Sequence, residues 1–252
     1  MTSGWTFLLS LVSTMAGAGL GMALRAWLPA AQFTPATKEV VRLGAGLLAT
    51  LAAVVISLLI ASAKNSYDTQ DAHFRQLAAH LVLADQLLAQ YGPEATEIRQ
   101  LMRRSVPAAM DRIWREKRTA APQSTAFTAT SLAEQFSHAI EALSPASDVQ
   151  RALKPRIVEA GIDIARDRLL IFADGDKPIQ TPFLLILMVW LTVIFASYSL
   201  FVEPGPFVGV ALLVFALSVS SALFLIADLS QPFAGLMQIS GEQFRNALAP
   251  LN

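Results

Sequence analysis

The strongest constraint on the fold is an uncharged apolar run from Leu43 to Ala63. Its length of about 21 residues matches the roughly 20 that a helix needs to cross the hydrocarbon core of a bilayer. Uncharged runs of similar length lie at residues 5–24, 183–202 and 207–227. The chain is 54% hydrophobic and its mean hydropathy is +0.49, values typical of a membrane protein. We therefore expect four membrane-spanning helices.

The middle of the chain has a different character. Between Lys64 and Thr181 lie 15 of the 19 Lys and Arg and 15 of the 19 Asp and Glu residues. Apolar residues at steps of three to four continue the second span as an amphipathic helix that ends at Gly92-Pro93. These predicted inward residues are Phe74, Leu77, Leu81, Ala84, Leu88 and Tyr91. Further helices are expected at about 94–118, 131–144 and 147–173, with a kink at Pro107, a loop at 119–130 and a bend at Pro155. The inward residues predicted for the last helix are Val149, Leu153, Ile157, Ala160 and Ile164.

The predicted fold class is an all-α membrane protein with four transmembrane helices and a helical block between the second and third. Residues 1–63 form a first hairpin, with a loop over 25–42, and residues 64–181 form the block. Residues 182–228 form a second hairpin, and 229–252 form a tail. The first span is expected to be a retained helix and not a cleaved signal peptide, because no Lys or Arg precedes it.

Four spans place both termini and the central block on the same side of the membrane. The turn between the third and fourth spans has no Lys or Arg, whereas Lys177 precedes the third span, which favours a cytoplasmic block. Arg25, Lys38 and Arg42 in the first loop favour the opposite orientation. We choose the cytoplasm for the block and the termini.

One face of the second span is small and weakly polar. Thr50, Ser57 and Lys64 are seven residues apart and therefore share a helix face. Gly46, Ala53 and Ala61 continue that face. Two interpretations stay open, since small residues allow helices to pack closely in a membrane, and a small polar face can also line a water-filled conduit.

Several function classes lack the residues that they need. The chain has no cysteine and a net charge of zero, so neither thiol chemistry nor nucleic-acid binding is indicated. No catalytic triad, carboxylate pair or phosphate loop is recognisable, so we expect no enzyme, no catalytic residue and no cofactor. His73 and His80 lie seven residues apart without further ligands, so no metal site is expected. Asp228, at the end of the last apolar run, is either an interfacial carboxylate or a functional one.

The order of these parts resembles the bestrophin family. One matching stretch runs from Leu59 to Asp68 and contains Asn65, Tyr67 and Asp68, where the second bestrophin helix leaves the membrane. Two more matches are Tyr-Gly-Pro-Glu-Ala at residues 91–95 and Asp-Leu-Ser-Gln-Pro-Phe-Ala-Gly at residues 228–235. With these motifs the chain is most similar to a bacterial bestrophin-like membrane protein family of unassigned function, over most of its length from residue 42 onward.

This resemblance implies a function. Bestrophins are pentameric ion channels whose second helices line the pore, so the resemblance implies a homo-oligomer in the bacterial inner membrane that conducts inorganic ions. The implied pore-lining residues are Gly46, Thr50, Ala53, Val54, Ser57, Ala61 and Lys64, with the narrow neck at Gly46, Thr50 and Val54. Residues at the bestrophin neck are bulkier than these three.

The resemblance also places Asp228 and Gln231 where bestrophins hold calcium, which makes these two residues a candidate ion-binding site. The acidic run of that calcium site is replaced here by Leu236-Met237. The alternative function is a non-conducting membrane scaffold whose cytoplasmic helices bind a partner. A small-molecule transporter has little support, because no inverted repeat or broken helix is recognisable.

Overall fold

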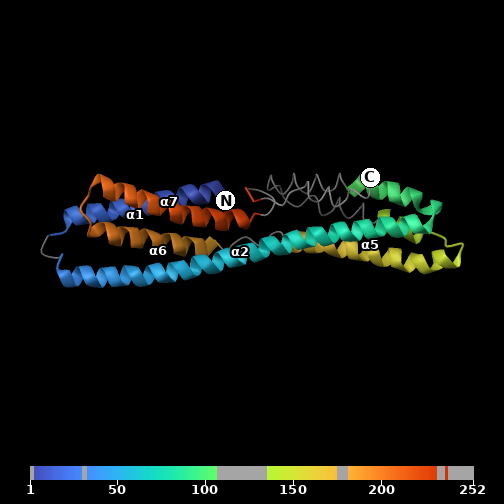
Figure 1. Cartoon of the computed structure of the whole chain (residues 1–252), viewed down its shortest axis with the longest axis horizontal. Helices are drawn as coiled ribbons and strands as arrows, with labels where there is room; N and C mark the ends of the chain where they lie inside the picture. Colours follow the sequence, from blue (N-terminus) through green and yellow to red (C-terminus); the bar gives the residue numbers. More distant parts are fainter. Residues whose placement is uncertain (1–2, 30–32, 107–134, 175–180, 232–235, 238–252) are drawn as a thin grey trace. The chain divides into compact units, whose positions relative to one another are not determined.

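The computed structural model describes residues 3–29, 33–106, 135–174, 181–231 and 236–237. Every regular element in these ranges is a helix. The long elements are α1 (Ser3–Trp27), α2 (Pro35–Tyr91), α5 (Asp148–Asp174), α6 (Thr181–Leu200) and α7 (Pro206–Leu229), and a 3-10 turn, η2, spans Pro93–Ala95 (Figure 1). Residues 96–106 and 135–141 are helical as well.

The chain forms two compact units. The first contains Met1–Tyr67 and Pro178–Met237, and the second contains Asp68–Lys177 and Gln238–Asn252. In the described part of the chain, α1, α2, α6 and α7 are long and apolar enough to cross a membrane. This result confirms the prediction of an all-helical chain with four apolar helices.

The second helix begins earlier than the sequence predicted. Thr34 caps it, because the backbone N–H of Thr37 donates to Thr34 Oγ1 at 3.1 Å, and Pro35 suits the first helical position. Lys38, Glu39 and Arg42 therefore lie in the second to third turns of a helix and not in the predicted loop. The Thr34 cap, and not the charged residues, determines where the helix begins. Charged side chains mark the edge of the apolar run but do not prevent a helix from forming.

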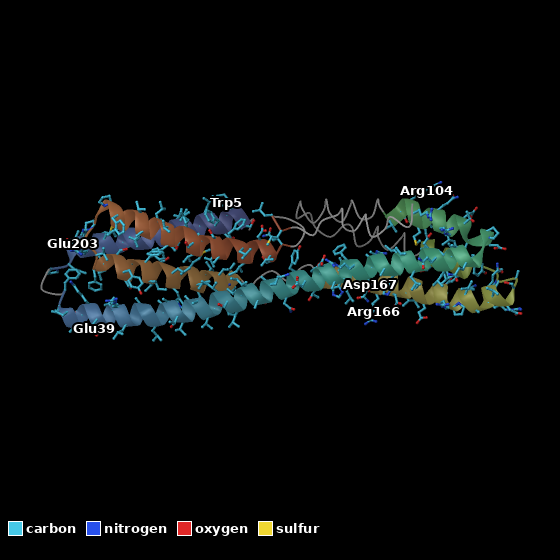
Figure 2. The ribbon with its side chains drawn as sticks, in the orientation of Figure 1. Trp5, Glu39, Arg104, Arg166, Asp167 and Glu203 are labelled. Atoms are coloured by element: carbon cyan, nitrogen blue, oxygen red, sulfur yellow. The ribbon has the colours of Figure 1, made fainter. Side chains whose placement is uncertain are left out.

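Two contacts close one end of the first unit. Arg25 Nη2, near the end of α1, lies 3.5 Å from Glu203 Oε1, in the turn between α6 and α7. Phe33 packs edge to face against Phe201 with the ring centroids 5.9 Å apart. Glu39 and Glu203 both lie at this end, as Figure 2 shows. Because α7 begins there, its last residues lie at the opposite end of the unit.

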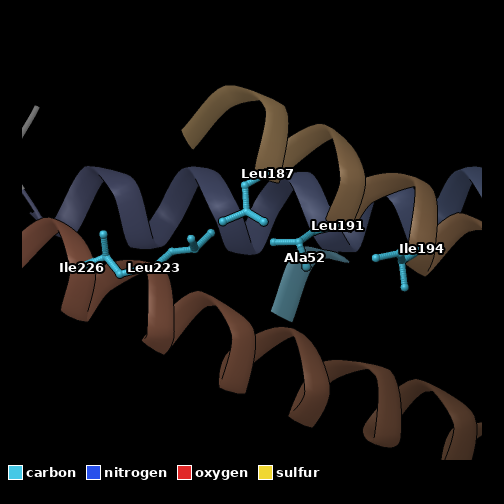
Figure 3. Close-up of a cluster of buried hydrophobic side chains, with 6 residues drawn as sticks. All are labelled: Ala52, Leu187, Leu191, Ile194, Leu223 and Ile226. Atoms are coloured by element: carbon cyan, nitrogen blue, oxygen red, sulfur yellow. The ribbon is translucent and has the colours of Figure 1, made fainter. Parts of the chain in front are cut away.

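The core of the first unit joins α2, α6 and α7. Its buried side chains are those of Ala52, Leu187, Leu191, Ile194, Leu223 and Ile226 (Figure 3). In Figure 1, α1 lies beside α6 and α7, and it contacts both of them. Ala18 of α1 packs there against Phe195 and Ala216.

Two glycines allow α1 to approach α6 closely. A Cβ atom added to Gly21 would lie 2.2 Å from the carbonyl oxygen of Ala196, and one added to Gly17 would lie 2.5 Å from that of Thr192. Between them, Gly19 faces open space. Ser13 Oγ and Thr192 Oγ1 form a hydrogen bond of 2.7 Å across the same two helices. Small residues and hydroxyl groups are the usual means of helix association in lipid.

The second unit is built on an antiparallel pair, the last turns of α2 and the helix α5. Gly92 ends α2 with φ +117°, in a region that is essentially restricted to glycine. The helix α5 starts with a capping box, in which the Gln150 N–H donates to Ser147 Oγ and the Ser147 N–H donates to Gln150 Oε1. Gln150 Nε2 also donates to the carbonyl of Tyr91, which ties the two helices together.

Most of the predicted inward residues of this unit are buried. All six apolar positions predicted along α2 beyond residue 70 are inside, namely Phe74, Leu77, Leu81, Ala84, Leu88 and Tyr91. In α5, Leu153, Ile157 and Ala160 are buried and Ile164 is half-buried. The prediction for Val149 was wrong, because this residue is 65% exposed. It lies in the first turn of α5, where no described element covers it.

Some predictions fall outside the described residues. These are the kink at Pro107, the loop over 119–130, the start of the helix predicted from residue 131 and the tail beyond residue 237. Pro155 lies inside α5, as predicted, and the bend there stays a prediction.

Candidate functional site

The part of α2 in the first unit has two contrasting faces. Its inner face carries Ala45, Ala52 and Ala63, which are 5%, 2% and 3% exposed. Among the residues that the structure describes, no other part of the chain covers the opposite side. We call the following set the uncovered face: Gly46, Thr50, Ala53, Val54, Ser57, Ala61 and Lys64, of which Gly46 is half-buried and the others are exposed.

The uncovered face has large apolar neighbours. Leu43, Leu47, Leu51 and Leu58 are all exposed and follow one another in steps of three to four residues with Val54 among them. At about 100° per residue, this leucine line is rotated on average by about 100° from the line of Gly46, Ala53 and Ser57. The uncovered side of α2 therefore divides into a small, weakly polar sector and a large, apolar sector. Val54 belongs by register to the apolar sector.

The small sector presents hydrogen-bond acceptors. The Thr50 hydroxyl donates to the carbonyl of Leu47 at 2.7 Å, and the Ser57 hydroxyl donates to the carbonyl of Ala53 at 2.8 Å. A hydroxyl has one proton and two lone pairs, so each oxygen can still accept hydrogen bonds. Water and cations, which need acceptors, are the natural partners of such a surface.

Close packing of small residues does not explain this face within one chain. The close approach in the first unit occurs at Gly17 and Gly21 of α1, where backbone atoms of α6 would collide with an added Cβ. A Cβ added to Gly46 would meet nothing within 4 Å. No described part of this chain covers the uncovered face, so lipid, water and another copy are its candidate partners.

The predicted membrane-exit residues continue α2 without interruption. Asn65 and Asp68 are exposed helical residues, and the division between the two units falls between Tyr67 and Asp68. Lys64 Nζ lies 5.4 Å from the centre of the Tyr67 ring, within the range of a cation–π contact. This contact stabilises the position of the Lys64 ammonium group at this end of the uncovered face.

Asp228 holds the backbone that follows α7. It is buried, at 1% exposure, and its carboxylate accepts hydrogen bonds from the N–H groups of Leu236 and Met237 at 3.0–3.2 Å. Its neighbour Gln231 lies just past the end of the helix and is half-buried. The carboxylate thus has a structural task that the sequence did not reveal, and its role as an ion ligand stays a prediction.

A charge cluster in the second unit escaped the sequence analysis. Asp85 stands between apolar positions of α2 in the sequence, yet it is 4% exposed and accepts hydrogen bonds from Arg99 at 2.9–3.0 Å and from Arg103 at 3.3 Å. Burial alone would raise the pKa of Asp85, but the hydrogen bonds and charges of the two guanidinium groups outweigh it and hold this pKa below its usual value. The cluster joins α2 to helical residues 96–106.

The histidines do not form a metal site in the described part of the chain. His80 Nδ1 lies 2.7 Å from the buried carboxylate of Asp167, so it links α2 to α5, as an inter-helix residue does. His73 takes part in a different interaction. Within the ranges that the structure describes, no group of three or more His, Cys, Asp or Glu side chains could hold a metal ion.

Comparison with known families gives a match over most of the chain. The model of the Bestrophin-like domain matches residues 12–244, which includes the whole of α2, α5, α6 and α7. No curated protein matches the chain. No solved structure matches it either.

Proposed function

Because the chain belongs to the bestrophin-like family, we propose that it assembles with copies of itself into an ion-conducting pore lined by α2. The members of the bestrophin family are ion channels and not enzymes, which gives the general direction of the proposal. The four long apolar helices place the protein in a lipid bilayer. We further propose the bacterial inner membrane, with the second unit and both termini in the cytoplasm.

The observation that carries the proposal is the register of α2. The small residues and hydroxyls are on its uncovered side, whereas its opposite side is packed against α6 and α7. Lipid tails cannot interact favourably with exposed hydroxyl oxygens, whereas water can donate hydrogen bonds to them and cations can be coordinated by them. A ring of copies that turns this sector to a common axis would give the hydroxyl oxygens of Thr50 and Ser57 a hydrated surrounding, and a pentamer is the ring that the family suggests.

The leucine line suits the same arrangement. In a ring, the sector of α2 beside the one that faces the axis lies against the neighbouring copy or the lipid. Leu43, Leu47 and Leu58 supply an apolar surface that suits either contact. Val54, whose register lies in this line, would form part of the contact with the next copy or border the pore.

Ion flux tests the pore directly. Purified protein in liposomes is expected to release K⁺ or Cl⁻ faster than empty vesicles do, and a flux no greater than that of empty vesicles across several salts contradicts the proposal. Thr50→Trp should reduce the flux strongly, because it places a bulky ring on the small sector. Leu51→Trp is the matched control, since Leu51 is exposed in the apolar sector.

A second candidate function is a membrane scaffold that binds a partner through its second unit. It is favoured by exposed apolar residues on one face of α5, namely Val158, Ile162 and Leu169. A native mass measurement in detergent distinguishes the candidates. A ring-sized oligomer favours the pore, and a monomer or dimer favours the scaffold.

A further inference from the structure

We propose that Glu39 sets the charge selectivity of the pore and makes it favour inorganic cations. This inference rests on the pore proposed above and adds to it the class of ion and the residue that selects it. Glu39 lies in the second turn of α2, in the part that the sequence had predicted to be a loop. It is exposed, and Figure 2 shows it at the end of the first unit that also holds Glu203.

The register of the helix places Glu39 on the small sector. It precedes Gly46 by seven residues and Ala53 by fourteen, so the three share one line along α2. Two positive residues lie nearby, Lys38 and Arg42. Round the helix they are rotated from Glu39 by about 100° and about 60°, toward the side of the buried Ala45. Glu39 is therefore the charged residue of these turns that lies nearest to the proposed pore axis.

The length of the helix places Glu39 at a mouth of the pore. Lys64 marks the other end of the small sector, and a helix of these 25 steps rises by about 37 Å. This rise lies between the roughly 30 Å of a hydrocarbon core and the roughly 40–45 Å of a whole bilayer. Glu39 and Lys64 thus fall near the two surfaces of the membrane, where a ring of copies would repeat each charge around the opening.

The two ends are not equivalent in charge. Rings of acidic side chains select cations, and rings of basic side chains select anions. The Lys64 ammonium group lies over the Tyr67 ring and takes part in a further interaction. In the described residues no ion pair includes Glu39. The acceptor oxygens of Thr50 and Ser57, between the two ends, also favour cations.

The test is the reversal potential of the reconstituted full-length protein in a KCl gradient. The wild-type protein is expected to pass K⁺ better than Cl⁻. With Glu39→Gln, the K⁺/Cl⁻ permeability ratio should fall by at least about threefold at 0.1 M salt, and the difference should shrink at 1 M, where the Debye length is about 3 Å. Glu39→Asp keeps the carboxylate and should keep the selectivity, whereas Glu39→Lys should reverse it.

Two controls separate this role from a general effect of surface charge. Lys38→Gln changes a charge next to Glu39 but off the small sector, and Glu203→Gln removes a carboxylate at the same end of the unit but outside α2. Both should shift the ratio much less than Glu39→Gln does. If the wild-type protein conducts and Glu39→Gln leaves the K⁺/Cl⁻ permeability ratio unchanged, the assignment of Glu39 is overturned while the pore stays in place. Equal shifts of this ratio in Glu39→Gln, Lys38→Gln and Glu203→Gln overturn it as well. If the wild-type protein carries no current, the pore itself is refuted and this inference with it.

Discussion

The contact between α1 and α6 allows a sharp prediction at Gly21. A methyl group at this position would lie 2.2 Å from the carbonyl oxygen and 2.9 Å from the carbonyl carbon of Ala196. Ordinary van der Waals contact begins at 3.4 Å, so the new atom would be more than 1 Å too close. The obstacle is backbone and cannot rotate away as a side chain does. Gly21→Ala therefore forces α1 to withdraw from α6.

The expected cost follows from two terms. Overpacking of a well-packed contact costs about 1–3 kcal/mol. Withdrawal of α1 also weakens the 2.7 Å hydrogen bond between Ser13 and Thr192, and such bonds in membranes contribute about 0.6 kcal/mol on average. We expect Gly21→Ala to lower the free energy of unfolding of the first unit by about 2–3 kcal/mol.

The control is Gly19→Ala, in the same helix and two residues away. A Cβ there would meet nothing within 4 Å, so this variant should unfold within about 0.5 kcal/mol of the wild type. Unfolding in mixed micelles with increasing SDS, followed by tryptophan fluorescence, measures both variants. Equal stability of Gly21→Ala and Gly19→Ala would show that α1 does not pack on α6 through Gly21.

Two further predictions concern the second unit. Asp85→Asn should lower the free energy of unfolding of the second unit by about 1–3 kcal/mol at pH 7. Since the folded pKa of Asp85 is depressed, its stabilisation is fully present above the unfolded pKa of about 3.9 and is lost as the pH falls through the lower folded value. Melting curves by circular dichroism should therefore converge for variant and wild type below about pH 4, and an unchanged gap at pH 3 contradicts the role of Arg99 and Arg103. Gly92→Ala should lower the free energy of unfolding of this unit by about 1–3 kcal/mol, because φ +117° strains any other residue. Gly161→Ala should not destabilise the unit, because a Cβ atom inside α5 at this position would meet its neighbours at ordinary contact distance.

The sequence was sufficient for the features that depend on one segment at a time. Four uncharged runs predicted four apolar helices, because length and apolarity alone decide whether a helix can cross a bilayer. The helix end at Gly92-Pro93 was also predicted correctly, since glycine and proline act locally. The early start of α2 was missed because the Thr34 cap is a weaker signal than the charges of Lys38 and Glu39.

Features that depend on distant segments could not be predicted. Asp85 is an ordinary polar residue in its own helix, and its burial becomes visible only with Arg99, on the far side of the turn at Gly92. Three neighbouring glycines of α1 look alike in the sequence, namely Gly17, Gly19 and Gly21, but of these three only Gly17 and Gly21 face α6. For α2, the sequence identified a small polar face, and the fold adds that the described residues of its own chain leave this face uncovered.

The most direct test of the account is whether the small sector of α2 faces water in the assembled protein. The chain has no cysteine, so single cysteines can be introduced without a background. In liposomes that conduct ions, a small water-soluble thiol reagent should react with Ser57→Cys and block the flux, and it should leave Leu58→Cys, in the apolar sector, unmodified. Modification of Leu58→Cys in place of Ser57→Cys, or a flux that persists after Ser57→Cys has reacted completely, would contradict a pore lined by this face.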